Sequence, residues 1–217
     1  MPKESLEARK ARAKKIFRTL GTIYPDAHCA LDFTNAFELL AATILSAQCT
    51  DERVNIVMKQ FRPRFPTPFA LSTAEPQEIE EVIRSTGFFR QKAKSLKSMA
   101  TDIVEKFGGE VPKTMEELVT LRGVGRKTAN VVLGNAFGIN AGIPVDTHVT
   151  RLSGLLKLST YTTPEKIELD LMELAPQKDW AMVTHYLISH GRSVCVARRP
   201  KCRECAIAEY CPSRQDK

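Results

Sequence analysis

The sequence predicts an all-α protein, on three observations. Apolar residues recur at helical spacing along most of the 217 residues, no segment alternates as a half-buried strand does, and the connections between helical segments are brief. We expect about ten short helices. No internal repeat or low-complexity segment interrupts them.

The first helix is expected over residues 5–23, where an apolar stripe lies among Lys and Arg side chains. The second, over residues 37–48, is apolar nearly all round and should be central to a core, and Asn35 is typical of its N-cap. It ends in Ser-Ala-Gln, so it delivers a polar amide at its C-terminal end. A third helix is expected over residues 51–61, stopped by Pro63.

Pro76 suits the first turn of a helix that ends at Gly87. Phe88 and Phe89 are expected in the connection that follows. Most such aromatic residues pack against the protein, but an exposed Phe in a turn can also wedge between nucleic-acid bases. A regular stripe over residues 96–107 then predicts a longer helix, closed by two glycines.

Thr114 with Glu117 predicts a capping box that opens a short helix. A tight turn at residues 121–125 separates this helix from the next, which should run from about Arg126 to Phe137. Three further helices are expected. The first begins near Thr147, with Asp146 at or beside its N-cap, the second near Thr163-Pro164, and the third near Lys178, ending at Gly191.

The turn between these helices is a candidate active site. Gly123 and Gly125 permit positive φ and close approach of a partner, and the helix that begins at Arg126 points its unpaired N–H groups out of the turn, where an anion can bind. Lys127 follows directly, and Asp146 comes after a short loop, so an amine and a carboxylate accompany the anion site. A Gly-x-Gly turn alone more often only connects two helices and binds nothing.

Charge is concentrated at the two ends of the chain. The net charge is +7, of which residues 1–20 carry +5 and residues 192–217 carry +4, which leaves −2 for the remainder. A basic protein of this kind favours an anionic partner. The longest apolar stretch, residues 36–47, is too short to span a bilayer, and no apolar segment follows the N-terminal Met-Pro-Lys-Glu. We expect a cytoplasmic protein without membrane contact.

Four cysteines in seventeen residues predict a metal site. In a reducing compartment they are not a disulfide framework, and their Cys-x6-Cys-x2-Cys-x5-Cys spacing suits either tetrahedral zinc or a four-iron cluster. The spacing favours iron–sulfur because structural zinc sites more often use two Cys-x2-Cys pairs. The ligands would be Cys195, Cys202, Cys205 and Cys211, with Arg198, Arg199 and Lys201 between them to offset charge or contact phosphates.

Together these motifs resemble the endonuclease III family of DNA base-excision repair enzymes, within the helix-hairpin-helix glycosylase superfamily. The resemblance runs from about residue 10 to Cys211 and rests on the segments Leu121–Asn130 and Val145–His148 and on the cysteine spacing. It implies a two-domain helix-hairpin-helix fold: a six-helix domain over residues 30–140, and a discontinuous domain of residues 1–29 plus 141–217 around a [4Fe–4S] cluster.

The resemblance also implies an activity and residue roles. The enzyme would be a monomeric DNA N-glycosylase and abasic-site lyase that acts on oxidised pyrimidines or abasic sites in double-stranded DNA, near the nucleoid in a bacterium. Lys127 would attack the sugar, and Asp146 would stabilise the positive charge that develops there. The backbone at Gly123, Gly125 and Arg126 would hold a phosphate.

Base displacement is implied for three further residues. Gln48 would fill the space of the extruded nucleotide, and Phe88 or Phe89 would wedge the stack. The chain departs from the family at Arg122, where proline is usual. Arginine lacks the backbone stiffness of proline, but its guanidinium offers a further phosphate contact.

Two alternatives stay open at this point. The first is an adenine-mismatch glycosylase of the same superfamily, which Lys127 argues against because that branch lacks a lysine nucleophile. The second is a non-catalytic DNA-binding module with structural zinc, which the identity of the metal would distinguish.

Overall fold

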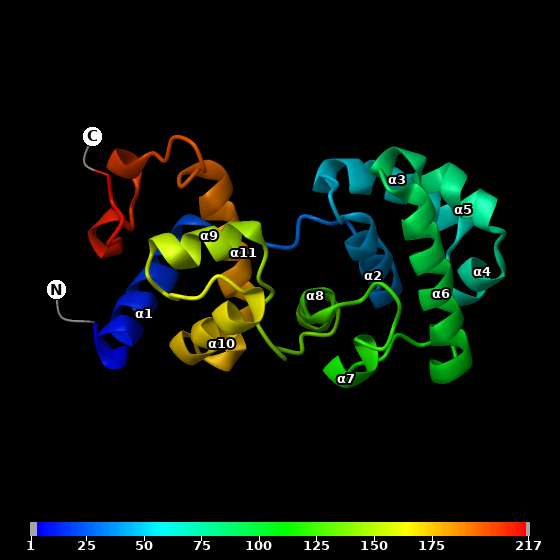
Figure 1. The fold of residues 1–217 in the computed structure, drawn as a ribbon, viewed down its shortest axis with the longest axis horizontal. Helices are drawn as coiled ribbons and strands as arrows, with labels where there is room; N and C mark the ends of the chain where they lie inside the picture. Colours follow the sequence, from blue (N-terminus) through cyan, green and yellow to red (C-terminus); the bar gives the residue numbers. More distant parts are fainter. Residues whose placement is uncertain (1–3, 216–217) are drawn as a thin grey trace. The chain divides into compact units, whose positions relative to one another are not determined.

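The computed structural model describes residues 4–215, all of whose regular structure is helical (Figure 1). The prediction of an all-α fold is confirmed. The chain forms two compact units, the first made of residues 1–28 and 142–217 and the second of residues 29–141. Within residues 4–215, no helix is both long and apolar enough to cross a membrane.

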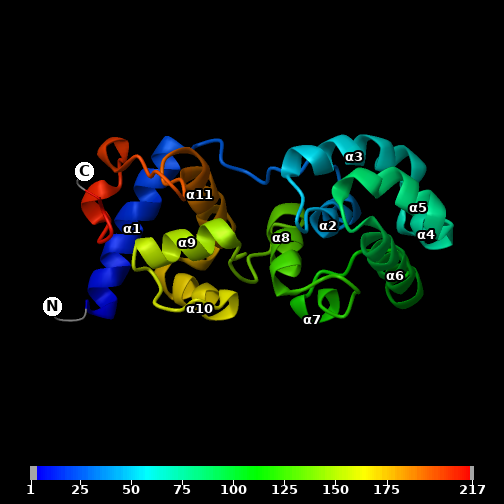
Figure 2. The same cartoon turned by 45° about the horizontal axis from the view of Figure 1, so that its top comes forward.

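Unit 2 is built around α2, a helix that is buried on nearly every side. It packs against α3, α6 and α8 (Figures 1 and 2). Eight of its ten residues are buried, as its continuous apolar sequence predicts. The α-helices of this unit are α2 (Ala36–Leu45), α3 (Asp51–Arg64), α4 (Pro68–Thr73), α5 (Pro76–Ile83), α6 (Phe89–Phe107), α7 (Met115–Leu118) and α8 (Arg126–Ala136), with a 3-10 turn η1 (Arg84–Thr86) before α6.

The start of α2 is capped as predicted. The side chain of Asn35 accepts a hydrogen bond from the backbone N–H of Glu38 at 3.0 Å. The end of α3 was predicted wrongly, because Pro63 lies inside the helix, which continues to Arg64. In the last turn of a helix a proline removes a single backbone hydrogen bond, and the packing of the helix outweighs that loss.

The boundary before α6 also differs from the expectation. Gly87 has φ +70°, and Phe88 follows in a left-handed conformation, but Phe89 is already the first residue of α6. Phe89 packs against the core of unit 2 and has the guanidinium groups of Arg84 and Arg90 over its ring, at 5.9 and 5.1 Å from the centroid. Only Phe88 therefore remains in the connection.

Unit 1 joins the N-terminal helix to the C-terminal third of the chain. Helix α1 contributes Ala13, Ile16 and Leu20 to a core shared with the later helices. The elements of the unit are α1 (Leu6–Ile23), α9 (Thr147–Leu155), α10 (Pro164–Leu174), α11 (Trp180–Ser193) and three 3-10 turns, η2 (Gln177–Asp179), η3 (Cys202–Glu204) and η4 (Ala208–Tyr210).

Gly191 does not end α11 as expected, but lies buried within it. A Cβ at this position would come within 3.0 Å of the Nδ1 of His148 and within 3.2 Å of the side chains of Arg151 and Leu152. Glycine is favoured there because the side chains of α9 approach α11 closely. Its role is packing, which a local sequence pattern does not distinguish from helix termination.

The half-buried imidazole of His185 makes the stability of unit 1 sensitive to acid. Burial, together with the charge of His28, lowers the pKa of His185 to about 4. The unfolded chain binds this proton near pH 6.5, so the stability that depends on a neutral His185 is complete above that pH and is lost as the pH falls toward 4.

We expect the free energy of unfolding to fall by about 2 kcal/mol between pH 7.5 and pH 5 through this group. In His185→Gln this part of the pH dependence should disappear. Urea unfolding of both proteins at the two pH values measures the difference. An equal pH dependence in the two proteins would contradict the assignment.

Candidate functional site

The turn before α8 uses its two glycines differently. Gly123 has φ +83°, and a Cβ there would lie 3.1 Å from the Cβ of Ser95, so both the conformation and the packing require glycine. Gly125 has φ −93° and is the N-cap of α8, with open space where a side chain would be. The positive φ that both glycines permit is thus used only at Gly123. Gly125 instead leaves the first N–H groups of α8 uncovered.

Lys127 is the second residue of α8, as the sequence predicts, and its side chain is exposed. Within the described part of unit 2, its amine makes no hydrogen bond or ion pair. Arg122 and Arg126 are exposed on the same segment. An exposed amine near the positive end of a helix, with two arginines on the same segment, is suited to meet an anionic substrate.

Asp146 is the N-cap of α9. Its Oδ1 accepts a hydrogen bond from the backbone N–H of Val149 at 2.8 Å, and the residue is half-buried. The prediction that Asp146 lies at or beside the N-cap of this helix is confirmed. A carboxylate has a second oxygen, so capping fixes its orientation without using all of its acceptor capacity.

Three of the predicted DNA-contacting residues line one depression in unit 2. They are Gln48, Phe88 and Gly123, which come from three separate turns, and the depression has a volume of about 240 Å³. Its other lining residues are Ile44, Ala47, Gln91, Lys92 and Ser95. The fold therefore brings the glycine turn together with both proposed base-displacing residues.

The two neighbouring phenylalanines have different surroundings. Phe88 is 68% exposed and Phe89 is packed against the core, so only Phe88 is free to enter another molecule. Gln48 is also exposed. Both Gln48 and Phe88 have positive φ, at 53° and 47°, a conformation that non-glycine residues adopt mainly where surrounding structure enforces it.

The four clustered cysteines surround a cavity of about 150 Å³ at the C-terminal end of unit 1. Burial raises the pKa of the Cys195, Cys205 and Cys211 thiols, so a metal that binds here has to displace protons. Among residues 4–215, no three His, Cys, Asp or Glu side chains converge closely enough to hold a single metal ion. Four thiols that line one cavity are donors that could hold a metal centre.

Polar side chains support the cavity. The Nη1 of Arg151 donates to the carbonyl of Cys195 at 2.5 Å and lies 3.9 Å from its sulfur. The Nε2 of His190 lies 3.5 Å from the sulfur of Cys205. Arg198, Arg199 and Lys201 are exposed on the loop between the first two cysteines.

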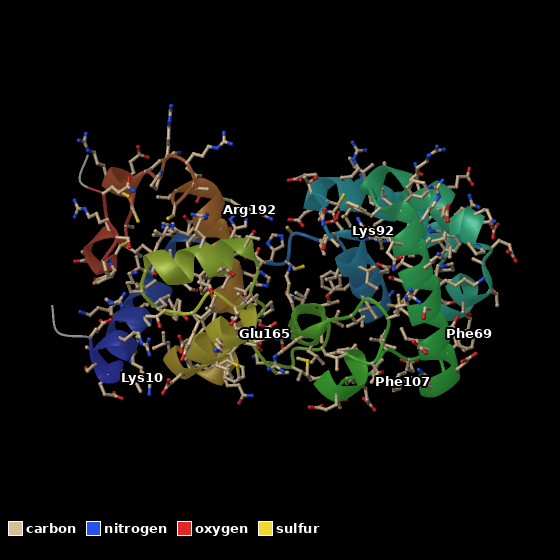
Figure 3. All side chains as sticks on the ribbon, in the orientation of Figure 1. Lys10, Phe69, Lys92, Phe107, Glu165 and Arg192 are labelled. Carbon is tan, nitrogen blue, oxygen red and sulfur yellow. The ribbon has the colours of Figure 1, made fainter. Side chains whose placement is uncertain are left out.

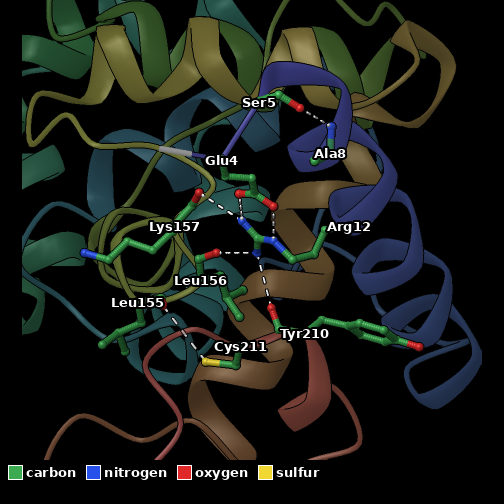
Figure 4. A network of polar contacts seen from close by, with 9 residues as sticks. All are labelled: Glu4, Ser5, Ala8, Arg12, Leu155, Leu156, Lys157, Tyr210 and Cys211. Atoms are coloured by element: carbon green, nitrogen blue, oxygen red, sulfur yellow. Dashed lines mark hydrogen bonds and ion pairs between the residues drawn. The ribbon is translucent and has the colours of Figure 1, made fainter. Parts of the chain in front are cut away.

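Arg12 ties the N-terminal helix to this C-terminal loop (Figure 4). One guanidinium nitrogen donates to the carbonyls of Leu156, at 2.6 Å, and Tyr210, at 3.2 Å, and another donates to that of Lys157 at 3.3 Å. Two further hydrogen bonds go to the carboxylate of Glu4. The end of α9 and the residue before Cys211 are thereby held by one side chain of α1.

The sequence did not predict the roles of two cations, Arg12 and Lys92. Lys92 is 5% exposed, and its amine donates to two backbone carbonyls beside the depression. Burial lowers the pKa of Lys92, an effect partly offset by the charge of Cys49. Each cation lies in line with its helix's buried stripe, four residues before Ile16 or Leu96. A charged residue at a core-facing position was the available signal.

Comparison with known proteins identifies relatives over nearly the whole chain. Residues 41–177 match the family described as HhH-GPD superfamily base excision DNA repair protein. Endonuclease III of Synechocystis sp. is 55% identical over 97% of this chain and 96% of its own, and Endonuclease III of Bacillus subtilis is 42% identical over 88% of each. A solved structure of a trapped Endonuclease III–DNA covalent intermediate has a TM-score of 0.89, is 39% identical, and covers 94% of this chain and 96% of that one.

The Arg12 network leads to a stability prediction. We expect Arg12→Met to lower the free energy of unfolding by about 2–4 kcal/mol, because three carbonyls, two of them partly buried, lose their charged donor. Lys10→Met is the matched control on the same helix. Its ion pairs with Glu7 and Glu173 are long, at 3.7 and 3.8 Å, and exposed. The control should change stability by less than about 0.5 kcal/mol. Equal losses in urea unfolding would refute the special role of Arg12.

Proposed function

Since the chain belongs to the endonuclease III family, within the HhH-GPD superfamily of base excision DNA repair proteins, we propose that it is a bifunctional DNA glycosylase. It removes oxidised pyrimidines from duplex DNA and then cleaves the abasic site by β-elimination. The observation that carries the proposal is the depression in unit 2, where Gln48, Phe88 and Gly123 meet on the unit that also presents Lys127.

The depression supports base extrusion. The glycosidic carbon of a stacked nucleotide is out of reach, so the nucleotide has to leave the duplex before it can react. The exposed side chain of Phe88 wedges the base stack, and the amide of Gln48 hydrogen-bonds in the vacated space. Phe89 supports this turn from the core side.

Phosphate binding positions the DNA without reading its sequence. The N–H groups at the start of α8, left uncovered by Gly125, hold a backbone phosphate through hydrogen bonds and the helix dipole. Arg122 and Arg126 add charge beside this site. Arg198, Arg199 and Lys201 offer a second group of phosphate contacts on unit 1.

Lys127 is the proposed nucleophile. The lone pair of its neutral amine forms a bond to the anomeric carbon while the glycosidic bond to the damaged base breaks. The base leaves with the electron pair of the glycosidic bond and takes up a proton. Opening of the sugar ring gives a Schiff base. Loss of a proton from the adjacent sugar carbon then expels the 3′ phosphate and cuts the strand. A relative has been trapped as a covalent intermediate with DNA, which supports a covalent step in the proposed reaction.

Asp146 is proposed to stabilise the positive charge that develops on the sugar and to transfer protons during these steps. Its N-cap hydrogen bond holds the carboxylate in one orientation. A fixed negative charge is more effective than one that must reorient during the reaction.

We propose that the four cysteines hold a [4Fe–4S] cluster in a domain of residues 1–29 and 141–217. The soft thiolate donors and the 150 Å³ cavity between them fit such a group, whereas a single-ion geometry is absent from the described residues. When bound, the cluster would supply covalent cross-links that hold the loop of exposed cations. The protein works as a monomer in the cytoplasm under this proposal.

The nucleophile can be tested by borohydride reduction. Incubation with duplex DNA that carries an oxidised pyrimidine should give a covalent protein–DNA adduct on denaturing gels, because borohydride reduces the Schiff base to a stable amine. Lys127→Ala should form no adduct. Lys106→Ala, which removes an exposed lysine at the C-terminal end of α6, should trap as the unmodified protein does. Trapping and cutting by Lys127→Ala would show that another group attacks.

The metal can be tested on the purified protein. We expect a brown protein with broad visible absorbance and about four iron atoms and four acid-labile sulfides per chain. Cys202→Ser should lose most of this iron. A colourless protein with about one zinc per chain would exclude the cluster and favour the zinc alternative.

A further inference from the structure

The two side chains proposed to enter the DNA share an unusual backbone conformation. Gln48 and Phe88 have φ of 53° and 47°, and the only other non-glycine residue with positive φ in residues 4–215 is Lys157. L residues rarely adopt this conformation unless neighbouring groups enforce it. The structure therefore has to contain something that holds both turns.

Lys92 is the group in contact with both turns. It lies in the first turns of α6 (Figure 3), and its side chain is almost completely buried. Its Nζ donates to the carbonyl of Leu45 and to the carbonyl of Thr86, each at 2.8 Å. A buried ammonium needs such acceptors, since water does not reach it.

Both acceptors are the last residues of helical segments. Leu45 ends α2 and Thr86 ends η1, and the carbonyls at helix ends lack partners within the helix. Gln48 follows Leu45 by three residues, and Phe88 follows Thr86 by two. One ammonium therefore fixes the exits of two helical segments from which the two exposed side chains emerge. Lys92 also lines the depression between them.

We propose that Lys92 is a positioning residue, which holds Gln48 and Phe88 in register so that they enter the duplex together. It touches neither the sugar nor the reacting atoms. The role rests on the proposed function and deepens it, because it assigns to Lys92 the extrusion step and not the chemistry of Lys127.

Extrusion and chemistry can be separated by the choice of DNA. A paired, stacked base is costly to extrude, whereas an abasic site has no base to unpair and a mismatched base less to lose. Loss of positioning should therefore slow the excision of a paired lesion and largely spare the cleavage of a pre-formed abasic site. Loss of folded protein would lower both rates by the same factor.

The variant is Lys92→Met, which keeps an apolar stem of similar length and removes the ammonium. Lys97→Met is the matched control, since Lys97 lies on the same helix and donates to one carbonyl, that of Ala74, at 2.7 Å. Ala74 is outside the depression. Lys92→Arg is the conservative variant, which restores charged donors to both carbonyls.

In single-turnover assays we expect Lys92→Met to slow excision of a paired oxidised pyrimidine by about tenfold or more and abasic-site cleavage by less than about threefold. When the oxidised pyrimidine lies in a mismatch, Lys92→Met should excise it faster than it excises the paired lesion. On the paired lesion, Lys92→Arg should regain part of the excision rate that Lys92→Met loses. Lys97→Met should show no difference between the substrates. Equal losses on both substrates with Lys92→Met would overturn the positioning role.

If Lys92→Met is too unstable for kinetic assays, a binding measurement can test the positioning role instead, because it does not depend on turnover. A duplex with a stable abasic-site analogue and a fluorescent adenine analogue opposite reports insertion of side chains into the stack. The unmodified protein should raise the fluorescence, and the folded fraction of Lys92→Met, at saturation, should raise it much less. An unchanged signal overturns the inference. Failure of the unmodified protein to trap on abasic DNA counts instead against the proposed function.

Discussion

A helix that is buried on nearly every side leaves its last carbonyls where water hardly reaches them, and this constraint shapes unit 2. Helix α2 satisfies its start with Asn35 and its end with the ammonium of Lys92. Each unsatisfied carbonyl would cost about 1–3 kcal/mol. The same ammonium serves η1, so the requirements of the core determine where the chain emerges at Gln48 and at Phe88.

Unit 1 uses a cation in the same way. The guanidinium of Arg12 holds the carbonyl of Leu156, the C-cap of α9, and that of Lys157, whose φ is 51°. All three non-glycine residues with positive φ in the described chain thus follow a helix end that is held by a Lys or Arg from another helix. Arg12 also contacts the left-handed residue itself, whereas Lys92 contacts carbonyls three residues before Gln48 and two residues before Phe88.

Local patterns predicted the elements and much of the candidate site. The N-caps Asn35 and Asp146 follow from short-range hydrogen bonding, and the all-α class follows from apolar periodicity. The errors arose where tertiary contacts decide. Pro63 is tolerated and Gly191 is favoured because of packing, and Lys92 gains its role by joining a carbonyl 47 residues away in sequence to one six residues away. Only the core-facing position of Lys92 marked it as unusual.

The order of the chain has a consequence for its synthesis. Unit 2 is continuous over residues 29–141, whereas unit 1 requires α1 together with the last third of the chain. During synthesis, all residues of unit 2 leave the ribosome before α9, α10 and α11 do. The apolar stripe of α1 therefore stays exposed until these helices have been made. A chain that ended after unit 2 would therefore leave Ala13, Ile16 and Leu20 of α1 without the apolar residues that bury them in the complete protein.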